Sequence, residues 1–207
     1  AQFDTSNPSR YESLLADAFG LLGFEVDHLG GPGKPDVILI GKLGSNSYTV
    51  VVEAKTCKKD NVVSLVQVNY GSINDHKEEY TADYAVMIAA KYAGGKLVDH
   101  AIKNRVGMIT TDTLISILRQ HDQFPFSIDE LRCLFEIEGF DESIKDKLFR
   151  ISAKHKHYLE LTTLILNIFE ELQRQQDVSE SISNNALYLL LLDRAQKEQM
   201  LTPERSQ

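Results

Sequence analysis

Apolar residues in the first part of the chain recur at the spacing of an amphipathic helix. One stripe runs through Tyr11, Leu14, Leu15, Ala18, Phe19 and Leu22. Asn7 suits the N-cap, Pro8 suits the first helical position, and Gly23 suits the end of the helix. The pattern therefore predicts a first helix from Pro8 to Leu22.

The residues after this helix have the spacing of strands. Residues 24–28 alternate between apolar and polar positions, as in a short strand. Three glycines and two prolines between positions 30 and 35 predict a loop. Residues 36–40 and 48–55 are two further strand patterns, separated by the turn sequence Gly44-Ser45-Asn46, so we expect an antiparallel hairpin.

Helices and strands then alternate as far as residue 120. A helix is expected over 62–80, although Gly71 weakens it, then a strand over 85–90, a helix over 96–104, a strand over 106–110 and a helix from Thr111. Strands joined through helices favour parallel pairing. The order predicts an α/β fold with a mixed central sheet flanked by helices.

The pattern changes from about Ser127 onward, where it is helical only. Ser127 and Glu130 have the spacing of a capping box, and residues 147–175 and 183–199 predict amphipathic helices. We therefore expect an α/β core over 1–126 and a helical C-terminal extension over 127–207. The extension would pack on the core or contact a partner.

The composition suits a soluble protein of a reducing compartment. The longest apolar run, residues 186–192, is too short to cross a bilayer, and no secretion signal opens the chain. The two cysteines, Cys57 and Cys133, form no CxxC pattern, which favours the cytoplasm and no membrane partner. The chain opens at Ala1 rather than Met, which leaves open that it is part of a longer protein.

The charge argues against tight binding of nucleic acid by bulk electrostatics, since the formal net charge is −8. The acidic excess is uneven: residues 1–120 carry twelve Lys and Arg against fourteen Asp and Glu, a net charge of −2. We therefore expect weak affinity for DNA from the α/β part alone.

Three charged residues near the predicted hairpin form a candidate catalytic set. Asp36 opens one strand, and Glu53 and Lys55 lie two positions apart on the next, so they share a face roughly 6–7 Å apart. Two carboxylates and an ammonium suit metal-assisted phosphodiester hydrolysis. The alternative is a turn aspartate and an exposed ion pair. Glu53 and Lys55, however, interrupt an apolar run, where charges are costly unless paired or bound to a metal.

These residues carry a family resemblance. Pro35-Asp36 followed by Glu53-Ala54-Lys55 resembles the signature of the PD-(D/E)XK nuclease superfamily, in its α-β-β-β-α-β order. The run HLGGPGKPD over 28–36 resembles the cleavage domain of Fok-type type IIS restriction endonucleases. The resemblance covers roughly residues 8–120, and Glu53 replaces the aspartate of the Fok-type domain, which the superfamily accepts.

The resemblance implies a restriction-endonuclease-like core and a Mg²⁺-dependent deoxyribonuclease in which Mn²⁺ substitutes. It implies that Asp36, Glu53 and the Ala54 backbone carbonyl ligate the ion and that Lys55 positions the attacking water. Two further candidates are Glu12, at the edge of the first helix's apolar stripe, and Gln67; each also has a plain structural interpretation. The lysines that flank the site are candidates for phosphate contact or ordinary surface residues: Lys34, Lys58 and Lys59.

The resemblance also implies partners. Double-stranded DNA would be the substrate, a separate domain or subunit would recognise the target, and a homodimer would cut both strands in the cytoplasm of a prokaryote. A junction resolvase or a methylation-dependent nuclease stays open within the same fold. The alternative outside enzymes is a non-catalytic interaction module, against which the intact Asp36, Glu53 and Lys55 set argues.

Overall fold

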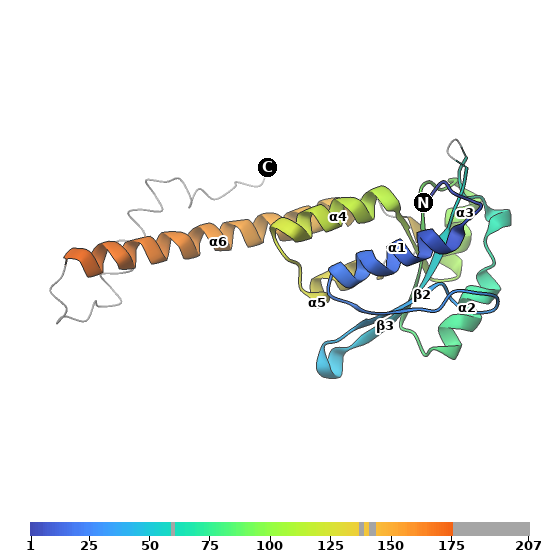
Figure 1. The fold of residues 1–207 in the computed structure, drawn as a ribbon, viewed down its shortest axis with the longest axis horizontal. Helices are drawn as coiled ribbons and strands as arrows, with labels where there is room; N and C mark the ends of the chain where they lie inside the picture. The colour runs from blue at the N-terminus through green and yellow to red at the C-terminus, as the bar shows by residue number, and fades with distance from the viewer. Residues whose placement is uncertain (59–60, 137–138, 141–143, 176–207) are drawn as a thin grey trace. The chain divides into compact units, whose positions relative to one another are not determined.

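The structure is a computed structural model that describes residues 1–58, 61–136, 139–140 and 144–175 (Figure 1). The chain divides into two compact units, Ala1–Ser152 and Ala153–Gln207. The first unit holds the sheet and the proposed catalytic residues. The second unit is described as far as Gln175.

A six-stranded mixed sheet forms the centre of the first unit, with the strands in chain order from β1 to β6. The first three strands pair antiparallel, and β3 to β6 pair parallel, as the intervening helices require. The strands are β1 (Glu25–His28), β2 (Val37–Gly41), β3 (Tyr48–Lys55), β4 (Tyr84–Ala89), β5 (Val106–Thr110) and β6 (Gly139–Phe140).

The helices occupy both faces of this sheet. The α-helices are α1 (Pro8–Leu21), α2 (Tyr70–Glu79), α3 (Lys96–Lys103), α4 (Thr111–Gln123), α5 (Ile128–Leu131) and α6 (Ile144–Gln175). Short 3₁₀ turns are η1 (Gly44–Asn46), η2 (Leu65–Gln67) and η3 (Arg132–Leu134). Figure 1 shows α1 and α4 alongside each other, where the Tyr11 hydroxyl lies 2.7 Å from the Thr111 hydroxyl.

Alternation along the strands builds two apolar layers. Val50 and Val52 of β3 face a core shared with α1 and α4, whereas Val51 faces a core shared with α2 and α3. All three valines are fully buried. β3 is therefore a central strand from which water is excluded. Glu53 and Lys55 belong to its last three residues, where the strand reaches the edge of both apolar layers.

Local signals explain the elements closest to the site. The Asn7 side chain accepts a 3.3 Å hydrogen bond from the Arg10 N–H and so caps α1. Gly23, at φ +95°, ends the helix in a conformation that disfavours other residues. Tyr11, Leu15 and Phe19 bury the inner face of α1, but Leu14, predicted to share it, is half exposed.

Most predicted elements are confirmed, and the hairpin is the clearest case. β3 has the predicted bounds, the turn lies at Gly44–Asn46, and β3, β4 and β5 pair parallel. The helix predicted over 62–80 is wrong in its first part: Val63 forms an isolated strand bridge to Tyr92, and α2 starts only at Tyr70. The Asn69 side chain accepts a 3.2 Å hydrogen bond from the Ser72 N–H and so caps α2, which explains why the helix begins there.

The prediction of helix only after Ser127 is also wrong, since β6 adds a strand beside β5. The first compact unit continues to Ser152, beyond the predicted boundary at residue 126, because apolar side chains after Ser127 complete its core: Leu131, Leu134, Phe135, Ile144 and Leu148. The Ser127–Glu130 capping box is confirmed. The helix predicted over 183–199 lies outside the described residues.

In the second unit, α6 buries some of its large apolar side chains and exposes others. Leu164 and Ile168 are buried, whereas other large apolar side chains are well exposed: Tyr158, Leu159, Leu166 and Phe169. Over the residues that the structure describes, α6 included, no helix combines the length and the apolar character needed to span a membrane.

Candidate active site

The β2–β3 hairpin brings Asp36 and Glu53 together. Val37 pairs with Val52, so continuing the antiparallel register by one residue places Asp36 opposite Glu53. Residues opposite each other in a sheet share a face, and here it is the face of Ile38 and Val51. The geometry therefore agrees with the sequence-based expectation that the two carboxylates converge.

Asp36 is fixed from both sides. Its backbone carbonyl accepts hydrogen bonds from the N–H groups of Leu29 and Gly30, at 3.2 and 3.3 Å. Its Oδ2 accepts a 2.7 Å hydrogen bond from the N–H of Ala54. The glycine-rich loop thus closes on one side of Asp36 while β3 holds its carboxylate on the other.

The Ala54 carbonyl lies where the strand ladder offers it no donor. The N–H and C=O of one strand residue point to the same side. Since the Ala54 N–H points to Asp36, its carbonyl points to the β2 side as well. Continued by two residues beyond the Val37–Val52 pair, the same register sets Pro35 opposite Ala54, and proline has no N–H. Pro35 therefore leaves this carbonyl available to another ligand.

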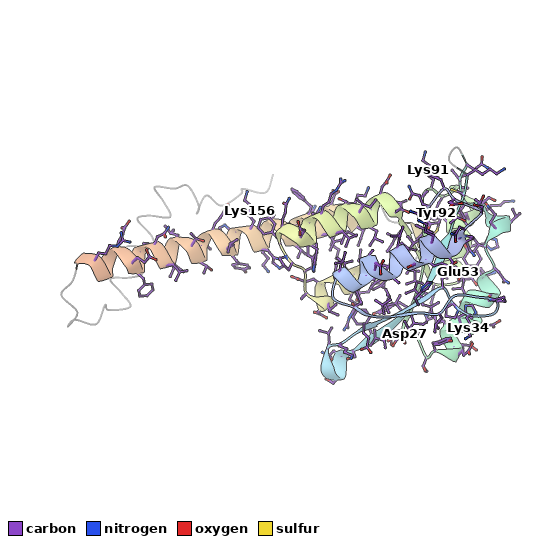
Figure 2. All side chains as sticks on the ribbon, in the orientation of Figure 1. Asp27, Lys34, Glu53, Lys91, Tyr92 and Lys156 are labelled. Carbon is purple, nitrogen blue, oxygen red and sulfur yellow. The ribbon has the colours of Figure 1, made fainter. Side chains whose placement is uncertain are left out.

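Lys55 and Glu53 form a close ion pair at the end of β3. Lys55 Nζ lies 2.6 Å from Glu53 Oε1, and the side chains are only 24% and 17% exposed. Both point to the same face, as their spacing of two predicts. Figure 2 labels Glu53 here and Lys34 on the loop that precedes β2.

The surroundings of Asp36 disfavour the ionised form of its carboxyl group. Burial and then the negative charge of Glu53 raise the pKa of Asp36 from its ordinary 3.8 to about 7. Glu12 adds to the increase, while the Ala54 N–H and Lys55 oppose it. An added cation would reverse this balance, because it favours two ionised carboxylates side by side.

Glu12 of α1 joins the same cluster. It contributes to the raised pKa of Asp36, and its Oε2 lies 3.6 Å from His28 Nε2 at the end of β1. The Glu12 side chain is 13% exposed, in keeping with its expected place at the edge of the apolar stripe. A Cβ at Gly30 would come within 3.3 Å of Glu12 Oε2, so the loop also approaches this carboxylate closely.

The other candidates lie around the site with different contacts. Gln67 lies on η2 rather than on the helix where it was expected, and it is exposed. Lys34 and Lys58 are also exposed. Lys59 lies outside the described residues. The roles assigned to all of these residues stay predictions.

The oxygen donors present fit a hard cation that keeps much of its water. Over the described ranges of the chain, no three His, Cys, Asp or Glu side chains form a group that could hold a metal ion. Mg²⁺ typically uses one or two carboxylates and retains several waters. Asp36, Glu53 and the Ala54 carbonyl supply that kind of donor set.

A sequence model of the Mrr_cat family, described as a restriction endonuclease, matches residues 3–118. The matched segment is more than half of the chain and contains Asp36, Glu53 and Lys55. The chain belongs to the Mrr_cat restriction endonuclease family. A search of curated proteins gave no match.

Two solved structures of restriction endonuclease FokI resemble this Mrr_cat domain in fold. FokI bound to DNA and FokI without DNA each align with a TM-score of 0.55 and 15% sequence identity, over 67% of this chain. The aligned part is 28% and 29% of the respective FokI chains, so this chain spans less than a third of FokI. At this identity the likeness shows the fold.

Sequence reasoning missed several features that position the site of this Mrr_cat domain. It gave no role to Pro35, although a proline before the motif aspartate signals a missing strand donor. It also missed a polar groove beyond Lys55, to which the N-terminal segment contributes Thr5. That segment is far from the groove in sequence and has no pattern that predicts the contact.

Proposed function

We propose that this chain is the cleavage module of a Mg²⁺-dependent endonuclease, related to type IIS restriction enzymes, that hydrolyses phosphodiester bonds in double-stranded DNA. The observation that carries the proposal is the convergence of Asp36, Glu53 and Lys55 at the end of one hairpin. Membership of the Mrr_cat restriction endonuclease family supports the same activity.

Each residue has a part in the proposed reaction. Asp36, Glu53 and the Ala54 carbonyl would hold Mg²⁺, and Mn²⁺ would substitute because it accepts the same oxygen donors. When bound, the ion supplies positive charge to the phosphate and to the attacking water. Lys55, held 2.6 Å from Glu53, would orient that water and stabilise the charge that develops on the phosphate. Glu12 would extend the carboxylate set through its proximity to Asp36.

Recognition of a target sequence would lie in a separate domain or subunit. The chain corresponds to less than a third of FokI, and its net charge of −8 offers little general attraction to phosphates. Cutting both strands requires two sites, so the working form would be a homodimer. The free, buried Cys57 and Cys133 suit the reducing cytoplasm of a prokaryote.

A plasmid nicking assay tests the proposal. The wild-type chain should convert supercoiled DNA to nicked or linear forms with Mg²⁺ or Mn²⁺ and not with EDTA. Asp36→Ala should abolish the conversion, whereas Asp17→Asn, which removes an exposed carboxylate of the same helix as Glu12, should leave it intact. No metal-dependent cleavage by the wild type would favour the non-catalytic interaction module. Cleavage of branched DNA alone would indicate a junction resolvase.

A further inference from the structure

A row of exposed residues, mostly apolar, follows one face of α6 in the second unit. Leu159 and Leu166 are each 58% exposed, Phe169 is 37% exposed, and the exposed Thr162 lies between the two leucines. The spacings of three, four and three residues are those of the a and d positions in a coiled coil. These four residues form the α6 seam. Exposed apolar residues are ordinary when scattered, but a row at this spacing is typical of a helix that packs against another helix.

The opposite face of α6 is also apolar, and it is already covered. Leu164 and Ile168 are only 5% and 4% exposed. At 100° per residue they lie on the side of the helix that faces away from the seam. A helix with apolar residues on two opposite sides is stable in water when both sides are packed. The seam is therefore a second packing surface of the same helix.

The threonines on this face can be buried at little cost. The Thr162 hydroxyl donates to the Tyr158 carbonyl at 2.8 Å, and the Thr163 hydroxyl donates to the Leu159 carbonyl at 2.9 Å. Because both hydroxyls bond back to their own helix, contact with a partner would leave neither of them unpaired. The seam can therefore be covered over its whole length, although a polar residue lies within it.

The charges beside the seam indicate which partner covers it. One flank has Lys156 at one end (Figure 2), Thr163 in the middle and Glu170 at the other end, each two positions from the next by a heptad. If a second α6 runs antiparallel with the two seams overlapped, the two-fold axis passes beside Thr163. Lys156 of each copy then lies opposite Glu170 of the other copy. A second copy of this chain is thus complementary to the seam in charge as well as in apolar surface.

A parallel arrangement lacks this complementarity. It would place Lys156 and Glu170 opposite Ile151 and Ile165 of the other copy, so neither charge would find a partner across the contact. Within one helix, Lys156 lies 3.8 Å from Glu160 and Glu170 lies 3.6 Å from Arg174. These are exposed surface pairs, which contribute little and leave both charges free to turn toward a partner.

We propose that the α6 seam pairs with the α6 seam of a second copy of this chain as an antiparallel two-helix coiled coil. Leu159 of one copy packs against Phe169 of the other, and Leu166 packs against Thr162. α6 lies outside residues 3–118, so the contact is separate from the segment that matches the Mrr_cat family. Its role in keeping two cleavage sites at a high effective concentration rests on the proposed nuclease function.

Sedimentation velocity of the full chain, in EDTA and without DNA, measures the contact independently of cleavage. The wild type should contain a dimer fraction that rises with concentration, since a seam of about three helical turns is short. Leu166→Glu should raise the dissociation constant roughly a hundredfold or more, because it buries a charge in an apolar layer. Asn167→Glu is the matched control: it adds the same charge at an exposed position outside the seam and should change the constant less than about threefold.

Charge reversal tests the direction of the two helices. Lys156→Glu or Glu170→Lys alone should weaken the dimer roughly tenfold, because each change brings like charges together at two symmetric places. The double variant should return to within about threefold of the wild type. The two residues lie roughly 21 Å apart along one helix, well beyond the screening length of about 8 Å, so this recovery requires a contact between chains. A double variant as weak as the two single effects combined excludes the antiparallel pairing.

Two further outcomes overturn the proposal. A wild type that stays monomeric at every concentration would leave the seam to residues 176–207 of the same chain or to a different protein. A dimer that Leu166→Glu leaves intact would place the contact elsewhere on the chain. The nuclease proposal is judged separately in the plasmid assay, where Leu166→Glu should still nick DNA but form less linear product. A chain that dimerises through the seam and shows no metal-dependent nicking overturns the nuclease proposal alone.

Discussion

The N–H of Ala54 donates a 2.7 Å hydrogen bond to the carboxylate of Asp36. This single contact joins the two halves of the motif across the hairpin and occupies one oxygen of Asp36. The other oxygen is left to a ligand, and the Ala54 carbonyl points to the same side of β3. Pro35 is the residue opposite Ala54 in this register. Because proline has no N–H, it donates no hydrogen bond to the Ala54 carbonyl.

The first prediction concerns the stability of metal-free protein. The pKa of Asp36 is raised to about 7 by burial and by Glu53, so the folded chain holds a proton that the unfolded chain releases from about pH 4 upward. The free energy of unfolding therefore falls as the pH rises from 4 to 7. Asp36→Asn should be more stable than the wild type at pH 8 by about 1–3 kcal/mol, since one pKa unit corresponds to about 1.4 kcal/mol and partial exposure screens the effect.

Urea unfolding in EDTA at pH 4.5 and pH 8 checks this prediction. The advantage of Asp36→Asn should be smaller at the lower pH, because the folded wild type keeps the proton there, and it should vanish only below about pH 3.8, where the carboxyl is protonated in both states. A variant less stable than the wild type at pH 8 would make Asp36 a structural residue.

The second prediction concerns metal affinity. Because a ligating carboxylate must be deprotonated, protons compete with the ion below the raised pKa of Asp36, about 7. The Mn²⁺ dissociation constant should rise about tenfold for each pH unit below this value, as expected for one competing proton. Titration calorimetry in buffers of different ionisation enthalpy measures both the affinity and the proton released. An affinity that does not change between pH 5.5 and 7 would exclude Asp36 as a ligand.

The pattern of apolar and polar positions in the strands predicts much of the fold and the central part of the site. In β3, buried valines on both faces followed by Glu53 and Lys55 predict the strand bounds and the shared face of the two charges. Local pattern fails at β6, whose two residues depend on Gly139 at φ +79° and on pairing with β5. It also fails at Ser64–Gln67, because a capping box can start a single 3₁₀ turn as readily as a helix.

The third prediction concerns Lys55. Lys55→Ala should lower the cleavage rate by roughly 10²–10⁴-fold, the usual contribution of a group that positions a proton or stabilises developing charge. Lys55→Arg should recover little of this, because the planar guanidinium cannot replace a compact ammonium 2.6 Å from Glu53. Single-turnover cleavage with saturating Mg²⁺ gives the rate. Equal loss of Mn²⁺ affinity in calorimetry would instead indicate that Lys55 acts by ordering the metal ligands.

The fourth prediction separates Glu12 from an ordinary helix glutamate. Glu12 acts electrostatically on Asp36, so Glu12→Gln should lower the pKa of Asp36 and reduce metal affinity about tenfold if the carboxylate belongs to the metal shell. Asp17→Asn removes the same charge from the exposed face of α1 and should leave the affinity unchanged. Equal effects of the two substitutions would assign Glu12 only a general electrostatic role.

The last prediction concerns DNA affinity, and it separates a cleavage module from a self-sufficient restriction enzyme. Residues 1–120 carry a net charge of −2, so only local lysines such as Lys34 and Lys58 can meet phosphates. The isolated chain should bind duplex DNA weakly, with little preference for sequence, and its affinity should fall only gently with salt because few counterions are released. Ca²⁺ would occupy the site without supporting cleavage, so titration against mixed-sequence duplexes in Ca²⁺ at several salt concentrations measures this. Lys58→Ala should reduce the slope of log affinity against log salt by about 0.9, the value for one lost phosphate contact. Tight, sequence-selective binding at physiological salt would place target recognition in this chain itself and would remove the need for a separate recognition domain.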